Sequence, residues 1–174
     1  MVDAIPQEQL DALPLGRLDF IGMNIYNSVM VRAGANGKPE FCPRAAGHPR
    51  TAIGWPITPE SMEWGTRYIW ERYGLPIYIT ENGLSCTDSI HLDGKVHDPA
   101  RIDFIHRYLL ALRRAIDSGV DVRGYFHWSL LDNFEWSEGY NERFGLIYLD
   151  YATGKRTPKD SAAWYAKIAE TNGK

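Results

Sequence analysis

The sequence predicts an α/β fold built on a parallel sheet. Three short apolar runs are rich in β-branched and aromatic residues, as buried strands are, and they cover residues 20–26, 77–80 and 124–130. Segments with helical spacing lie between and after these runs, so strands and helices alternate along the chain. Strands joined by crossover helices form parallel sheets, which carry functional residues at the carboxyl ends of the strands.

Each helix is indicated by its own boundary signals. The clearest helix has Asp98 as N-cap and ends at Gly119. Its apolar residues recur every three or four positions, which predicts that one face packs on the sheet; they are Ile102, Ile105, Leu109, Leu112 and Ile116. A second helix is predicted between Thr58 and Gly74, and a third over residues 160–168. Residues 33–54 contain several glycines and prolines and are expected to form a long loop.

The number of strands is small for such a fold. The 174 residues are 44% hydrophobic, which is enough for one core. However, an open parallel sheet of three strands leaves two unpaired edges and an apolar inner face. Eight strand–helix units that close into a barrel need about 250 residues. We therefore expect residues 1–174 to form one domain that belongs to something larger, or that pairs with strands from another chain.

Composition excludes several classes of partner. The net charge is −3 and no run of Lys or Arg occurs, so we expect no nucleic acid partner. No stretch is apolar for the roughly 20 residues that a membrane span needs, so we expect no membrane partner. The N-terminus lacks a basic region and an apolar region, so we expect a cytoplasmic protein without a signal peptide. The two cysteines and five histidines show no ligand spacing, so no metal site is expected.

Glu81 is the residue that points most directly to chemistry. It follows the second apolar run and precedes Asn82 and Gly83, where a strand ends and the chain turns. A carboxylate at that place faces the mouth of a parallel barrel, although an isolated Glu after a strand is more often a solvated turn residue.

Longer motifs decide between these readings. Residues 77–83, IYITENG, resemble the nucleophile motif of the family 1 glycoside hydrolases, the β-glucosidase family. Residues 125–149 resemble the C-terminal signature of that family almost residue for residue. Residues 18–26 are similar to its sixth-strand motif, and residues 155–160 to the approach to its last helix. The resemblance implies the C-terminal portion of a (β/α)8 TIM barrel, about its last three strand–helix units, with the N-terminal strands absent from this chain.

The resemblance also implies catalytic roles. Glu81 would be the nucleophile of a retaining β-glycosidase, which forms a covalent glycosyl-enzyme. Tyr26 matches the tyrosine that orients the nucleophile, although it could also be an ordinary core residue. Asn24 lies two residues earlier on the same face of its strand, so it could reach the same pocket or serve as a structural amide. No cofactor is implied, because carboxyl groups carry out both steps.

The matched residues of the third motif are implied to bind the sugar. Glu135 would accept hydrogen bonds from the 4- and 6-hydroxyl groups, Trp128 would stack on the ring, and Trp136 would offer its indole N–H. Phe144 would line the pocket. Tryptophans also fill cores, and for Trp55 and Trp64 nothing separates packing from an aglycone contact. Because a carboxylate at residue 135 repels a 6-phosphate, the substrate would be a free β-glucoside or short β-linked oligosaccharide, with galactose or fucose as alternatives to glucose.

One part of the site is missing. A retaining enzyme needs a second carboxyl group about 5 to 5.5 Å from the nucleophile. The family takes it from an Asn-Glu-Pro motif that this sequence lacks, so we expect the chain alone to be inactive. Its partner would be the N-terminal part of the same barrel. The alternative is a non-catalytic fragment that binds sugar or forms a homo-oligomer, and a thioglucosidase with a replaced acid/base is a third possibility.

Overall fold

The centre of the computed structural model, which describes residues 5–12 and 16–173, is a parallel sheet. Its three strands lie in the order β1, β4 and β5. They are β1 (Ile21–Asn24), β4 (Ile77–Asn82) and β5 (Val122–His127). Each strand overlaps one of the three apolar runs, so the prediction of a parallel α/β sheet is confirmed.

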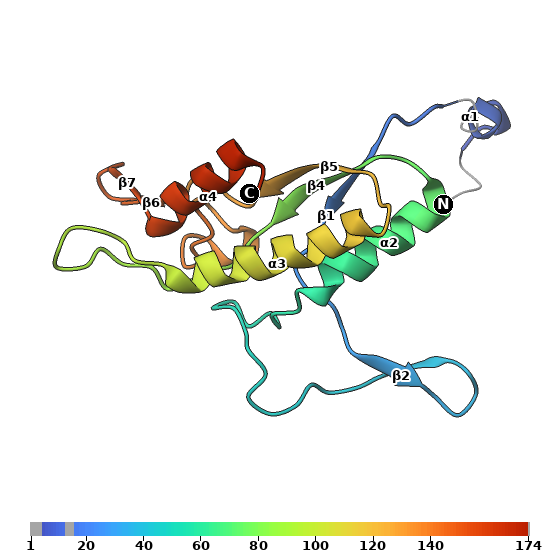
Figure 1. Cartoon of the computed structure of the whole chain (residues 1–174), viewed down its shortest axis with the longest axis horizontal. Coiled ribbons are helices and arrows are strands. Elements are labelled where there is room, and N and C mark those ends of the chain that lie inside the picture. Colours follow the sequence, from blue (N-terminus) through green and yellow to red (C-terminus); the bar gives the residue numbers. More distant parts are fainter. Residues whose placement is uncertain (1–4, 13–15, 174) are drawn as a thin grey trace.

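Three helices lie on one face of this sheet (Figure 1). They are α2 (Glu60–Tyr73), α3 (Pro99–Asp117) and α4 (Asp160–Thr171). Helix α2 connects β1 to β4 and α3 connects β4 to β5, so both cross between neighbouring parallel strands. Pro99 begins α3, and Gly74 ends α2 with a left-handed φ of 61°, as the boundary signals in the sequence predict.

The remaining elements are short: α1 (Gln7–Ala12), β2 (Val31–Ala33), β3 (Pro39–Phe41), the 3-10 helix η3 (Trp136–Glu138), β6 (Ile147–Leu149) and β7 (Arg156–Pro158). Strands β2 and β3 correct the expectation of a long loop over residues 33–54. They form an antiparallel hairpin that projects from the body of the protein (Figure 1). An ion pair of 2.8 Å between Arg32 and Glu40, which face each other across the hairpin, adds to its backbone hydrogen bonds.

The third strand is displaced from the predicted range of 124–130. It begins at Val122 and ends at His127, because the next residues find backbone partners elsewhere. The backbone N–H of Ser129 donates to the carbonyl of Phe144 at 3.2 Å, and the N–H of Ile147 donates to the carbonyl of Leu130 at 2.9 Å. The chain therefore leaves the sheet after β5 and starts a long loop that returns at residues 144–147.

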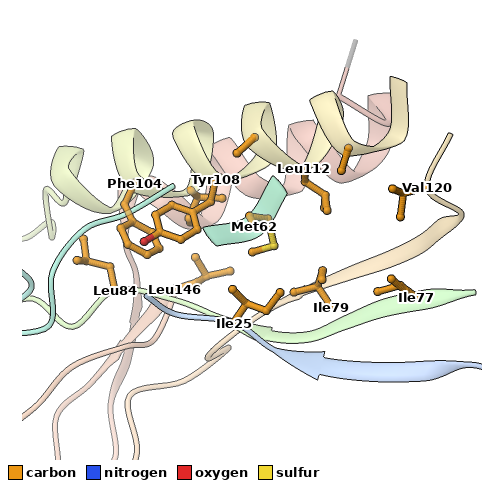
Figure 2. Close-up of a cluster of buried hydrophobic side chains, with 13 residues drawn as sticks. Ile25, Met62, Ile77, Ile79, Leu84, Phe104, Tyr108, Leu112, Val120 and Leu146 are labelled. Carbon is orange, nitrogen blue, oxygen red and sulfur yellow. The ribbon is translucent and has the colours of Figure 1, made fainter. Parts of the chain in front are cut away.

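The hydrophobic core lies between the sheet and the helices (Figure 2). Ile77 and Ile79 of β4, Met62 of α2 and Phe104 of α3 belong to one cluster, and all four side chains are buried. Burial of each such side chain contributes about 1.5 to 3 kcal/mol. Together they hold the helical layer against the strands.

The buried face of α3 differs slightly from the predicted one. Its central residues are Phe104 and Tyr108, whereas Ile116, which was predicted to face inward, is 41% exposed. Tyr108 tolerates full burial because its hydroxyl group donates to the carbonyl of Tyr26 at 2.8 Å and accepts from the N–H of Thr58 at 2.9 Å. The aromatic side chains thus set which face of the helix turns inward.

The opposite face of the sheet is largely uncovered. Phe20 and Phe126 are 53% and 57% exposed. Within the described ranges, no further strand pairs with the outer edge of β1 or of β5. The sheet therefore presents an apolar face and two free edges, as the sequence predicts for a sheet of so few strands.

The expected cytoplasmic location stays a prediction. Within residues 5–12 and 16–173, no helix has the length and apolar character needed to cross a membrane. Residues 1–4 belong to the segment from which the absence of a signal peptide is expected, and they lie outside the described ranges.

Gly83, which follows β4, lies against the loop after β5. A Cβ atom at this position would lie 1.8 Å from the carbonyl oxygen of Trp128. We expect Gly83→Ala to lower the free energy of unfolding by about 2 kcal/mol or more, because the backbone must move to relieve the overlap. Urea denaturation of the two purified chains measures the difference.

Gly65 of α2 provides a matched control. A Cβ atom there would meet only the Cδ1 atom of Ile25, at an ordinary 3.7 Å. Gly65→Ala should therefore raise stability by about 0.5 to 1 kcal/mol through helix propensity. Equal effects of the two substitutions would contradict the close approach at Gly83.

His97 links the loop before α3 to the start of α4. Its Nδ1 lies 2.6 Å from a carboxylate oxygen of Asp160, and its Nε2 lies 2.9 Å from one of Asp93. These hydrogen bonds, that to Asp160 first, raise the pKa of His97 above its usual value. A raised pKa means that protonated His97 stabilises the folded state below pH about 6.5 and that this contribution is lost as the pH rises.

We therefore expect the melting temperature of the wild type to exceed that of His97→Gln most clearly near pH about 5.5. At that pH Asp93 remains ionised, because its pKa is lowered by the N–H of Lys95 and by His97. The difference should shrink toward pH about 9. Thermal melts of both proteins across this range measure it, and a difference that grows with pH would contradict the assignment.

Candidate active site

The candidate site lies at the carboxyl ends of the three parallel strands. Tyr26 follows β1, Glu81 lies near the end of β4, and Trp128 follows β5. Because the strands are parallel, these ends share one edge of the sheet, which is where α/β barrels carry their active sites.

A β-bulge in β4 determines which way Glu81 points. Met23 of β1 pairs with Ile79, but the next residue of β1, Asn24, pairs with Glu81. On the other side, Ile79 pairs with Tyr125 and Asn82 with His127, so β4 holds one extra residue between Ile79 and Asn82. Strict alternation would direct Glu81 to the same side as Ile79, toward the helices. The extra residue instead leaves Glu81 on the uncovered side.

Tyr26 holds the Glu81 carboxylate. Its hydroxyl group donates a hydrogen bond of 2.7 Å to Oε2 of Glu81. Burial, followed by this hydrogen bond and the negative charges of Glu81 and Glu135, raises the pKa of Tyr26 well above its usual value. Tyr26 therefore stays protonated at any physiological pH and remains a donor to the carboxylate. This contact fixes the direction in which Glu81 points.

Aromatic side chains form one wall beside Tyr26. The ring of Tyr26 meets Trp55 edge-on at 5.2 Å between centroids, and it meets Phe144 at 6.4 Å. Trp55 and Phe144 also contact each other at 6.1 Å. The wall thus contains Phe144, whose role in lining a sugar pocket stays a prediction, and, as an addition to the predicted residues, Trp55. Its position in the loop after β1 gave no signal that separates this contact from packing elsewhere.

The loop after β5 brings two further candidates together. The indole N–H of Trp128 donates to Oε2 of Glu135 at 3.3 Å. Trp136 is next to Glu135 but is 81% exposed, and its φ of 41° lies in the left-handed region, which is unfavourable for a residue with a bulky side chain. The structure therefore joins Trp128 to Glu135, while Trp136 extends into solvent.

Asn24 is engaged elsewhere. Its Oδ1 accepts a hydrogen bond of 2.7 Å from the hydroxyl group of Thr80. It also lines a groove of about 380 Å³ between β1 and α2, together with Tyr26 and Trp64. That groove does not include Glu81 or Glu135, so Asn24 lies beside the candidate site rather than within its hydrogen-bonding centre.

The comparison with known families decides what this arrangement belongs to. The model of glycosyl hydrolase family 1 matches residues 2–174. The chain belongs to this family. Both the resemblance found in the motifs and the predicted (β/α)8 barrel architecture are confirmed, because the solved relatives are family 1 β-glucosidases and the chain has the fold of a part of their barrel.

Family 1 relatives of several specificities are similar to this chain. The beta-glucosidase A of Thermotoga maritima is 45% identical over 160 residues, which are 90% of this chain and 35% of that protein. A bifunctional beta-D-glucosidase/beta-D-fucosidase of Bifidobacterium breve is 40% identical, covering 87% of this chain and 37% of that protein. A 6-phospho-beta-galactosidase of Streptococcus equi subsp. zooepidemicus is also 40% identical, with coverages of 88% and 37%.

A solved family 1 structure gives the same result for the fold. The beta-glucosidase from Thermotoga maritima in complex with glucoimidazole superposes with a TM-score of 0.87 at 41% identity. The match covers 100% of this chain and 40% of that chain. The present chain therefore spans little more than a third of the length of its curated family 1 relatives.

Two further residues, buried Asn82 and partly buried His127, support the site and carry no predicted role. Asn82 donates to the carbonyl of Ile25 at 2.7 Å and accepts from the hydroxyl group of Tyr125 at 2.7 Å, so it joins all three strands beside Glu81. His127 lies 3.2 Å from the carbonyl oxygen of Phe144. Burial, aided by the charge of Arg101, lowers the pKa of His127 to about 3 and keeps it neutral. The signal for Asn82 was its place in the motif directly after Glu81.

Proposed function

We propose that this chain carries the nucleophile side of a retaining β-glycosidase active site. The observation that supports this most directly is the hydrogen bond of 2.7 Å from Tyr26 to Glu81 at the carboxyl end of β4. An aimed carboxylate at this place can attack the anomeric carbon of a β-glycoside from below the ring. The attack expels the aglycone and leaves a covalent glycosyl-enzyme on Glu81.

The second catalytic carboxyl group would come from outside this chain. It would protonate the leaving oxygen in the first step and then activate the water that releases the sugar. Retention of configuration requires it at about 5 to 5.5 Å from Glu81, on the side of the sheet that is uncovered here. The N-terminal part of the barrel would supply it, together with the strands that close the sheet edges. No cofactor takes part in either step.

The sugar would bind between Glu81 and the loop after β5. Glu135 would accept hydrogen bonds from sugar hydroxyl groups, Trp128 would contact the ring, Trp136 would add its indole N–H, and Phe144 would close the pocket wall. The carboxylate of Glu135 disfavours a 6-phosphate, so we infer a terminal β-linked glucose, or fucose or galactose, as the substrate. The names of the Thermotoga and Bifidobacterium relatives agree with this class.

A second candidate function rests on the uncovered face of the sheet. Phe20 and Phe126 are more than half exposed there, and the outer edges of β1 and β5 pair with no strand in the described ranges. Such surfaces promote association between copies of a chain. In this reading the chain is non-catalytic, and it forms a homo-oligomer or binds sugar without hydrolysing it.

One experiment separates the two functions. Hydrolysis of 4-nitrophenyl β-D-glucoside is measured for the chain alone, for the N-terminal barrel portion of the Thermotoga maritima beta-glucosidase A alone, and for their mixture. Activity in the mixture only is expected. Turnover by this chain alone would contradict the need for a second part. An inactive mixture, with a stable oligomer or sugar binding by the chain, would favour the non-catalytic function.

A further inference from the structure

A network of buried ion pairs lies beneath the loop that carries Trp128 and Glu135. It contains three cations and three carboxylates, which are Arg101, Arg143, Lys159, Asp88, Asp98 and Asp132. Arg143 is 16% exposed at its side chain and the others are 4% or less. Ion pairs so far from water are expensive to bury and are poor evidence for stability alone, so a role in fixing geometry is the better explanation.

We propose that Asp132 is a positioning residue for the sugar-binding loop, residues 128–146. It would hold the base of this loop so that Glu135 and Trp128 keep their places relative to Glu81. The inference rests on the proposed function, because it assigns Asp132 to the same site. Asp132 itself is 1% exposed, so it acts through the loop and not by contact with the sugar.

The contacts of Asp132 join the two ends of the loop. One carboxylate oxygen accepts from Lys159 Nζ at 2.8 Å and from the N–H of Gly145 at 2.9 Å. The other accepts from Arg143 Nη1 at 2.7 Å and from the N–H of Leu149 at 3.3 Å. Asp132 is near the start of the loop, whereas Arg143 and Gly145 are near its end. The carboxylate therefore closes the loop at its base.

The same network ties the loop base to the rest of the fold. Lys159, just before α4, also contacts Asp88 at 2.5 Å, and Asp88 lies in the segment between β4 and α3. Arg101 of α3 donates to the carbonyl of Arg143 at 2.9 Å and to Asp88 at 2.7 Å. The loop is thereby fixed to both flanking helices rather than held only by its own ends.

Close packing at the base leaves the loop little freedom. A Cβ atom on Gly145 would lie 2.2 Å from the backbone nitrogen of Asp132, so only glycine fits beside it. The tip, in contrast, is a small unit closed by its own hydrogen bond, from the N–H of Glu135 to the carbonyl of Gly139 at 2.6 Å. A closed tip on a fixed base moves as one body, so the base sets the position of Glu135.

The test compares Asp132→Asn with Asp98→Asn. Asp98 is also buried and bonds Arg101 and Ser161, but it forms no hydrogen bond or ion pair of its own with residues 128–146 and reaches the loop only through Arg101. In the full chain labelled with nitrogen-15, we follow hydrogen exchange of the Trp128 indole N–H, identified with Trp128→Phe. Asp132→Asn should speed this exchange about tenfold or more, and Asp98→Asn by less than about twofold.

Kinetics of the mixture with the N-terminal barrel portion provide the second readout. Asp132→Asn should lower kcat/KM for 4-nitrophenyl β-D-glucoside about tenfold or more, mainly through KM, because contacts to the sugar are lost. Asp98→Asn should change it less than about threefold at a temperature where both variants are folded. Arg143→Gln removes one arm of the same contact and should act like Asp132→Asn if the latter fails to fold.

Two results would overturn the inference. One is an equal change in the exchange rate of the Trp128 indole N–H in Asp132→Asn and Asp98→Asn. That result would mean that the network contributes to stability only and does not position the loop. The other is an unchanged KM in a variant in which the Trp128 indole N–H exchanges faster than in the wild type. An inactive wild-type mixture would count against the proposed function, whereas the exchange measurement would still decide the role of Asp132.

Discussion

Replacement of Glu81 by glutamine is expected to lower the turnover of 4-nitrophenyl β-D-glucoside by about a thousandfold or more in the mixture with the N-terminal barrel portion. The amide has nearly the same size as the carboxylate and its oxygen still accepts a hydrogen bond from Tyr26. It cannot, however, form the glycosyl ester, so the covalent step is lost while the fold is kept. Initial rates measured at equal concentrations of folded protein check the prediction.

The stereochemistry of a rescued reaction tests the same assignment more sharply. In Glu81→Ala, added azide can enter the space left by the side chain and attack the anomeric carbon once. A single displacement inverts the configuration, so the product should be an α-glycosyl azide. A β-glycosyl azide would assign Glu81 to the acid/base role instead.

A glutamate to which no contact with the substrate is assigned serves as the control for both variants. Glu138→Gln alters a residue of η3 whose carboxylate accepts a hydrogen bond of 3.4 Å from the hydroxyl group of Ser137. It should leave the rate within about twofold of the wild type. A large loss of turnover in Glu138→Gln would show that removal of another carboxylate has the same effect as removal of Glu81. The assignment of Glu81 as nucleophile would then fail.

Replacement of Arg101 by leucine is expected to lower the free energy of unfolding by about 3 to 5 kcal/mol. The side chain is fully buried, and its guanidinium group contacts both Asp98 and Asp88. Leucine would leave Asp98 as a buried charge without a cation and would also free the carbonyl of Arg143. Urea denaturation followed by tryptophan fluorescence measures the loss.

Arg107 of the same helix is the matched control. It pairs with Asp103 at 2.6 Å, but both side chains are more than 60% exposed. Solvent screens such a pair, so Arg107→Leu should leave the free energy of unfolding nearly unchanged. Similar decreases in the free energy of unfolding for Arg101→Leu and Arg107→Leu would mean that the burial of Arg101 does not increase its contribution to stability.

The order of strands and helices was predictable because it follows from the local spacing of apolar residues. The runs at residues 77–80 and 20–26 are apolar on a strand pattern, and the spacing within residues 99–117 is that of a helix. The exact face of α3 was not predictable in the same way. Tyr108 is buried because distant groups at Tyr26 and Thr58 satisfy its hydroxyl group, and periodicity carries no information on such partners.

The candidate site was predictable where a motif specifies it and not where the fold assembles it. The motif directed attention to Glu81 and Tyr26, which the structure joins by a hydrogen bond. Trp55 reaches the same wall from a loop with no motif, so its contact depends on how residues 50–58 fold back. Asn24 shares a face with Tyr26, as alternation predicts. Its amide oxygen, however, accepts a hydrogen bond from the hydroxyl group of Thr80 on the neighbouring strand.

The bulge in β4 has a consequence for how freely this strand can change. Asn82 faces the helices and its neighbour Glu81 faces away from them, because the single extra residue shifts the alternation of β4. A β4 strand of the same length without the bulge would exchange their sides, burying a charge and exposing the amide that bonds the neighbouring strands. The proposed nucleophile and the amide that joins the three strands therefore depend on the same bulge, so a change that removed it would affect both.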